Sequence, residues 1–141
     1  MLEFLKIIGG VAAFIIGQAI LQFVFQPIKD FNKQRGDTSY LLLFHQSKIV
    51  NVTKDKKACA EIREMGAALV STMRQIPFYN FLAQLRVFGL PSKNSVLVAA
   101  QELNGIVYSL DSNEQHGNSA VTNSETLQKI SQLLKIQTAY R

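Results

Sequence analysis

An uninterrupted apolar run near the amino terminus constrains this chain more than any other feature. Residues 7–25 read IIGGVAAFIIGQAILQFVF and contain no charged side chain. A helix rises about 1.5 Å per residue, so the run covers roughly 28 Å, close to the hydrocarbon thickness of a bilayer. A core helix would need a polar face, and the run has no continuous one. The run therefore predicts a membrane-spanning helix, with residues 1–26 as the anchor.

A secretory signal peptide is another segment that begins with an apolar run. It would need a basic leader, a shorter apolar stretch and small residues before a cleavage site. The run instead ends in Phe23, Val24 and Phe25, which are too large for the positions that a signal peptidase reads. No cysteine stands near this end to accept a lipid. We therefore expect an anchor that is not cleaved.

The basic residues are unevenly distributed around the run. Only Lys6 and the amino terminus precede it, and Glu3 offsets them. Because cytoplasmic flanks of membrane spans are rich in Lys and Arg, this bias predicts an outer amino terminus and a cytoplasmic domain at residues 27–141. The Lys and Arg residues that follow the run would also be attracted to an anionic inner leaflet, each by up to about 1 kcal/mol near the surface. The set comprises Lys29, Lys33, Arg35, Lys48, Lys54, Lys56 and Lys57.

The predicted span has two distinctive faces. Gly9, Ala13 and Gly17 recur at four-residue spacing, which lets two membrane helices approach closely. Gln18 and Gln22 are one helical turn apart, and an amide in hydrocarbon needs a hydrogen-bonding partner. We expect these five residues to mediate self-association or pairing with another membrane protein. The alternative is that the glycines are ordinary for a membrane helix and that Gln22 is hydrated near the interface.

The remainder of the chain shows helical periodicity and no alternation typical of strands. Pro27 should kink or break the helix, or begin a new one. Apolar residues at three- and four-residue intervals predict helices at 28–50, 53–75 and 78–88, then from the N-cap Ser92 to 110, and from Asn123 or Ser124 onward. Residues 111–122 form the predicted loop, and the tail from 137 to 141 should fray. The fold class is all-α: one transmembrane helix followed by a small cytoplasmic helical bundle.

Side chains that could perform chemistry are sparse. His45, His116 and the single cysteine, Cys59, are too far apart to match a zinc-ligand spacing. We expect His45 to be a hydrogen-bonded core or boundary residue and Cys59 a small core residue. Glu61 and Glu64 lie one turn apart and are typical of a solvated face with local ion pairs. The sequence predicts no catalytic residue, metal, cofactor or small-molecule substrate, and hence no enzyme.

The segment IPFYNF at residues 76–81, followed by GLP at 89–91, has two open interpretations. It can form an aromatic groove for a partner, or it can be a tight helical corner that fills one end of the core. Only Arg86 accompanies the aromatic residues, whereas nucleic-acid binding would need basic and aromatic side chains interleaved on one face. We therefore do not expect nucleic acid as a ligand.

The junction QPIKDFNK at residues 26–33, with Gly36 and the run YLLLF at 40–44, carries a family resemblance. It resembles a group of small, uncharacterised bacterial inner-membrane proteins with one amino-terminal span, a Q-P-I-K-x-F junction and a helical cytoplasmic part. The resemblance covers residues 18–110 and implies a bacterial origin and this topology. It implies no activity and no site residues.

Two functions of different classes are consistent with these features. The first is a membrane-anchored helical interaction or scaffold module, either oligomeric or an accessory subunit of a membrane complex. The second is a membrane-perturbing effector that acts through association of its transmembrane helix. A scaffold would depend on a protein partner as well as on the anionic bilayer, whereas an effector would act on the bilayer itself.

Overall fold

The computed structural model describes residues 1–112 and 119–140, and within these residues every regular element is a helix. This confirms the all-α prediction. Half of the predicted loop at 111–122, residues 113–118 with His116, lies outside the described residues, as does Arg141; its last four residues belong to α7 instead. The elements are α1 (Leu2–Ile20), the π-helical turn η1 (Leu21–Phe25), α2 (Gln26–Phe44), α3 (Gln46–Val50), α4 (Lys56–Gln75), α5 (Tyr79–Gln84), α6 (Lys93–Asp111) and α7 (Ser119–Leu134).

The first three elements form one helix of 43 residues, from Leu2 to Phe44. Pro27 does not break it, contrary to one of the expectations. Proline has no N–H to donate, and its ring would clash with the carbonyl four residues back in a regular helix. The turn before it is π-helical, and the N–H of Gln26 donates to the carbonyl of Leu21, five residues back. Pro27 then occupies the first turn of α2, where its missing N–H matters least.

The helix predicted at 28–50 is divided in two by His45, which leaves the helical region at φ −96° and ψ 7°. The change of direction allows the short α3 to pack against α7. The next helix begins at Lys56 rather than at 53, because Asp55 is its N-cap: its carboxylate accepts from the N–H groups of Lys57 at 2.9 Å and Ala58 at 3.1 Å.

The N-cap predicted at Ser92 is confirmed. The hydroxyl of Ser92 accepts from the N–H of Ser95 at 3.0 Å. The cap predicted at Asn123 or Ser124 is wrong, because α7 already begins at Ser119. Asn123 is buried within this helix instead.

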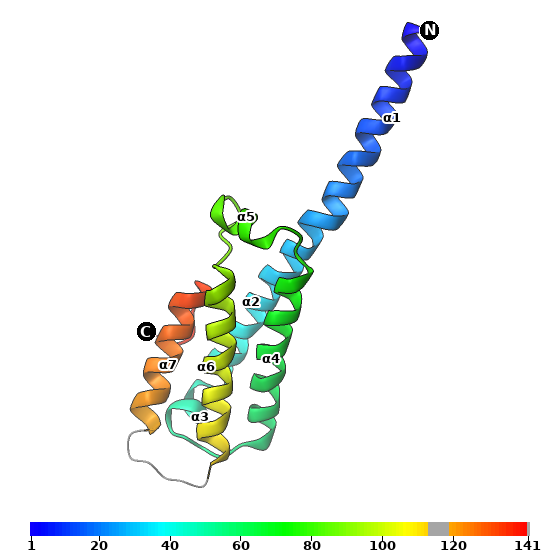
Figure 1. Ribbon diagram of the computed structural model, residues 1–141. Helices are drawn as coiled ribbons and strands as arrows, with labels where there is room; N and C mark the ends of the chain where they lie inside the picture. Colours follow the sequence, from blue (N-terminus) through cyan, green and yellow to red (C-terminus); the bar gives the residue numbers. More distant parts are fainter. Residues whose placement is uncertain (113–118, 141) are drawn as a thin grey trace.

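Four helices, α2, α4, α6 and α7, run side by side and enclose one core (Figure 1). The largest fully buried side chains come from the inward faces of these helices and, in the case of Ile49, from α3. They are Phe31, Leu42, Ile49, Ile62, Leu69, Met73, Leu103, Ile106, Leu110, Leu127, Ile130 and Leu134. Burying a side chain of this size contributes about 1.5–3 kcal/mol. Most of the stability of residues 27–140 therefore comes from this interior.

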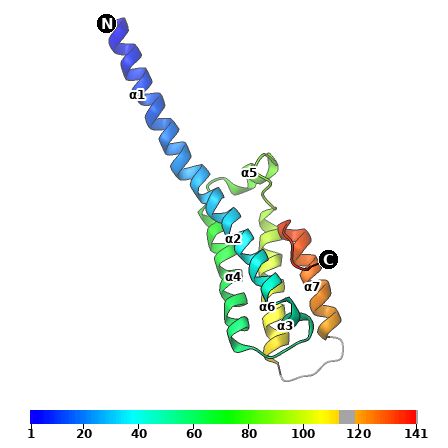
Figure 2. The ribbon, with the colours of Figure 1, turned by 180° about the vertical axis from the view of Figure 1, so that it is seen from behind.

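The two ends of the bundle differ. α1 projects away from one end, where α5 forms a short corner between α4 and α6 (Figure 2). The opposite end holds α3 and the segment that leads into α4 (Figure 1).

Candidate membrane interface

The helix α1 makes no contribution to the core. None of its residues is buried, and large side chains such as Phe14 and Ile15 are 67% and 61% exposed. Among the described residues, the helix that contains it is the one long and apolar enough to span a membrane. A core helix of a soluble protein with this composition would be covered by other elements, and α1 is covered by none.

The five residues predicted to mediate helix association all lie on this uncovered segment. A Cβ atom built at Gly9 or Gly17 would meet no other atom within 4 Å, so this face has room for a neighbouring helix. Ala13, Gln18 and Gln22 are also exposed. Gln22 lies in η1, where the wider turn alters its alignment with Gln18. Association through these residues remains a prediction.

The seven basic residues do not form one group near the span. Lys29 and Lys33 are exposed on the first turns of α2, directly after α1. Lys48 lies in α3, beyond the end of α2, and from Lys29 to Phe44 the helix α2 rises by roughly 22 Å. That distance exceeds the Debye length of about 8 Å at physiological salt. A bilayer around α1 would therefore attract Lys29 and Lys33 but not Lys48.

The remaining lysines of this set also lie at the end of the bundle away from α1. Lys54 precedes α4, and Lys56 and Lys57 form its first turn. Lys48 donates to the carboxylate of Asp55, and this hydrogen bond is the main reason why the pKa of Asp55 is lowered to about 2. In the structure α2 carries these four lysines away from α1, so the fold does not favour the expectation that they lie near the inner leaflet, which stays a prediction.

Arg35 has a structural role that the sequence did not reveal. Its Nε donates to the backbone carbonyl of Leu134 at 2.9 Å, and a second nitrogen donates to the same oxygen. A third donates to the side chain of Asn32 at 2.9 Å. Burial lowers the pKa of the guanidinium. Arg35 thus satisfies a carbonyl at the carboxyl end of α7 and fastens α2 to it, rather than facing a lipid surface.

His45 is buried and hydrogen-bonded, as expected. Its Nε2 lies 2.7 Å from a carboxylate oxygen of Glu61, and the other ring nitrogen, Nδ1, is buried with no partner among the described atoms. Glu61 is half-buried and paired with His45, and is not part of a fully solvated face. Cys59 is buried as expected, and burial raises the pKa of its thiol. The described residues contain no group of three His, Cys, Asp or Glu side chains placed as metal ligands.

The aromatic corner at residues 76–91 has two distinct sides. Tyr79 is buried: its hydroxyl donates to the carbonyl of Pro91 at 2.8 Å, and its ring packs edge-on against Phe31. Burial raises the pKa of this phenol to about 12. This side fills the end of the core. Phe78 and Phe81, by contrast, are 82% and 61% exposed, which the periodicity of the segment did not indicate.

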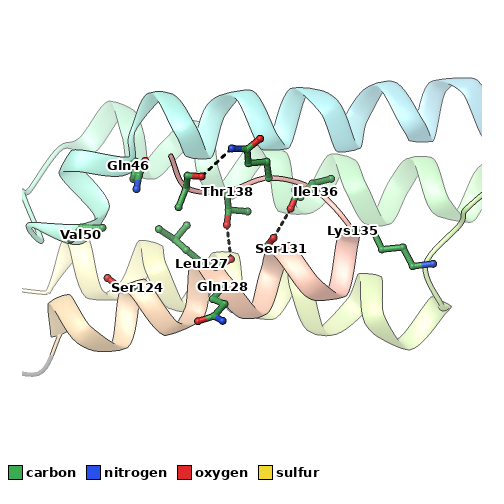
Figure 3. Close-up of a pocket in the computed structure, with 11 residues that line it drawn as sticks. Gln46, Val50, Ser124, Leu127, Gln128, Ser131, Lys135, Ile136 and Thr138 are labelled. Carbon is green, nitrogen blue, oxygen red and sulfur yellow. Dashed lines mark hydrogen bonds between the residues drawn. The ribbon is translucent and has the colours of Figure 1, made fainter. Parts of the chain in front are cut away.

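The carboxyl-terminal tail is ordered through residue 140, contrary to expectation. It folds back over α3 and α7 and completes a groove of about 670 Å³ (Figure 3). Thr138 is buried and donates to the carbonyl of Leu127 at 2.8 Å, and the N–H of Tyr140 donates to the side chain of Gln46 at 3.1 Å. These hydrogen bonds hold the tail. The periodicity of the sequence does not indicate them, because their acceptors belong to α7 and α3.

The features that bear on function are thus an uncovered apolar helix, a continuous connection from it into the bundle, and exposed aromatic side chains on α2 and α5. No protein-family model, curated protein or solved structure matches this chain.

Proposed function

We propose that this protein is a membrane-anchored helical interaction module of a bacterial inner membrane. In this proposal α1 crosses the bilayer once, the amino terminus is outside, and the bundle lies in the cytoplasm, where it binds a partner. The observation that carries it is the helix from Leu2 to Phe44, because its first half is apolar and fully uncovered while its second half belongs to the core.

The two halves belong to one continuous helix. The buried side chains of Phe31 and Leu42 hold α2 in the bundle, and no loop separates α2 from α1. Any protein that binds α1 within the bilayer would therefore also fix the direction of the bundle. This coupling is useful in a subunit that must present a surface at a defined angle to a membrane complex.

One surface of the bundle has the composition of a binding site. Tyr40 and Phe44 on α2 are 68% and 65% exposed, and their rings stack at 6.1 Å. They border a groove of about 420 Å³ that Glu61 and Glu64 of α4 also line. Exposed aromatic side chains of this kind are enriched at protein interfaces. The acidic border favours a partner segment that carries both apolar and basic side chains.

The test is purification of the full-length chain from native membranes in mild detergent, followed by a mass measurement. We expect a defined complex, either of two copies or with another membrane protein. The double variant Tyr40→Ala/Phe44→Ala should lose it. Tyr108→Ala removes an equally exposed aromatic ring, 75% exposed on α6, and should retain it. A monomer without a bound protein in all three cases would contradict the proposal.

A further inference from the structure

A cluster of exposed apolar side chains lies on the corner between α4 and α6. We name residues 77–89 the α5 corner. Within it, Phe78, Phe81, Leu85 and Val87 are 82%, 61%, 49% and 74% exposed. The opposite side of the corner is anchored, because Tyr79 is buried in the core. The corner therefore presents an apolar surface on a fixed base.

This surface lies at the end of the bundle from which α1 projects. Phe88, at the end of the corner, contacts Phe25 edge-on, with ring centroids 5.7 Å apart. Phe25 is the last residue of the uncharged apolar run. Both views of the molecule show α5 beside the junction between α1 and α2 (Figures 1 and 2). If α1 spans a bilayer up to Phe25, the α5 corner is at the level of the interface.

The backbone of the corner holds its side chains outward. Two residues of the corner, Phe78 and Arg86, have left-handed conformations with φ of 53° and 54°. Such conformations are unfavourable for large side chains and persist only where surrounding packing imposes them. Here the buried Tyr79 and its hydrogen bond to Pro91 supply that packing. Among the described residues outside the apolar run and its flanks, Phe78 is the most exposed large hydrophobic side chain.

The segment that forms and flanks the α5 corner carries only positive charge. Between Glu64 and Glu102 the chain has no acidic residue and three basic ones. These are Arg74, Arg86 and Lys93, and all three are exposed. The aromatic pair of α2 differs in this respect, since acidic side chains border it. Apolar side chains accompanied by cations alone suit an anionic lipid surface, in which the rings enter the interface and the cations meet phosphate groups.

We infer that the α5 corner is a second membrane contact, which inserts Phe78, Phe81, Leu85 and Val87 into the leaflet from which α1 emerges. This inference rests on the proposed anchoring by α1. The bilayer is favoured over a protein as the occupant because the corner is continuous with the span, through the contact between Phe25 and Phe88. Two points of attachment would fix the rotation and tilt of the bundle relative to the membrane, which one helix alone leaves free.

The experiment places single tryptophans in the full-length protein, which has none of its own. The protein is reconstituted in bilayers of phosphatidylethanolamine and phosphatidylglycerol, with lipids brominated along the upper acyl chain as quenchers. Phe81→Trp reports on the corner and Phe14→Trp on the span. Tyr108→Trp, which is also exposed but lies near the far end of α6, is the matched control. We expect brominated lipid to quench the emission of Phe81→Trp and Phe14→Trp, and to leave that of Tyr108→Trp unchanged.

The outcomes separate this inference from the proposed function. Quenching of Phe14→Trp without quenching of Phe81→Trp would overturn the second membrane contact and leave the anchor intact. An unquenched Phe14→Trp would instead contradict the anchor itself. A blue-shifted but unquenched Phe81→Trp would show that a protein, such as a second copy, covers the corner, and this too would overturn the inference.

The contribution of charge has its own test. Replacing phosphatidylglycerol by phosphatidylcholine should weaken the quenching of Phe81→Trp, and Arg86→Gln should weaken it in anionic bilayers. The quenching of Phe14→Trp should stay the same under both changes. Equal quenching of Phe81→Trp in both kinds of bilayer would contradict the role assigned to the cations.

Discussion

Replacing Arg35 by lysine tests whether this residue fastens α2 to the end of α7. Lysine retains the charge but cannot reproduce the planar donors of a guanidinium. Two nitrogens of Arg35 bind the carbonyl of Leu134, and one binds the side chain of Asn32. Hydrogen bonds to charged groups contribute about 1.5–3 kcal/mol each, and an ammonium should recover part of this. We therefore expect Arg35→Lys to lower the free energy of unfolding by about 2 kcal/mol.

A loss of this size corresponds to a fall in melting temperature of roughly 8 °C for a domain of about 100 residues. The assay is thermal unfolding of the full-length protein in detergent, followed by circular dichroism. Lys33→Ala is the matched control, since Lys33 is exposed one half-turn away on the same helix and should change the free energy of unfolding by less than about 0.5 kcal/mol. If Arg35→Lys and Lys33→Ala melt at the same temperature, the structural role assigned to Arg35 is refuted.

Three further predictions follow from individual contacts. The pKa of Asp55 is lowered to about 2 from 3.8, so its contribution to stability is complete above pH 4 and is lost as the pH falls toward 2; Asp55→Ala should flatten the acid side of a stability–pH profile. The side-chain amide of Asn123 donates to the carbonyl of Ile49 at 2.8 Å, and Asn123→Ala should cost about 1–3 kcal/mol and increase hydrogen exchange in α3. Gln18→Leu with Gln22→Leu should reduce cross-linked dimer in membranes while leaving the melting temperature of the bundle unchanged; an unaltered dimer would exclude these amides from the interface.

Local signals in the sequence were sufficient to predict most of the helices. They also predicted a helix cap where a single side chain decides the boundary. Ser92 is an example, because an N-cap needs only a hydroxyl and an N–H group three residues later. The length and composition of the apolar run alone were enough to predict the helix that is uncovered in the structure. Asn123 shows the limit of such signals. Its side chain could cap a helix, but in the structure it forms hydrogen bonds with Ile49 and Ser109, which lie on other helices, and it is buried.

The candidate site depended on information that periodicity does not contain. The stripe of apolar residues along α5 does not distinguish the side that meets the core, at Tyr79, from the side that remains open, at Phe81. In the sequence Arg35 cannot be told from its basic neighbours. Its acceptor, the carbonyl of Leu134, lies 99 positions further along the chain and is close to it only in the folded structure. The placement of Lys48 far from the span likewise followed from the continuity of α2 past Pro27, which a π-helical turn permits.

Accessibility of single cysteines in intact cells tests the membrane anchor most directly. In a Cys59→Ala background, Glu3→Cys lies before the apolar run and Tyr108→Cys lies on the exposed surface of α6. A maleimide that cannot cross membranes should label Glu3→Cys in intact cells, and should label Tyr108→Cys only after the inner membrane is permeabilised. Labelling of Tyr108→Cys in intact cells, or protection of both positions until permeabilisation, would contradict a single span with an outer amino terminus and a cytoplasmic bundle.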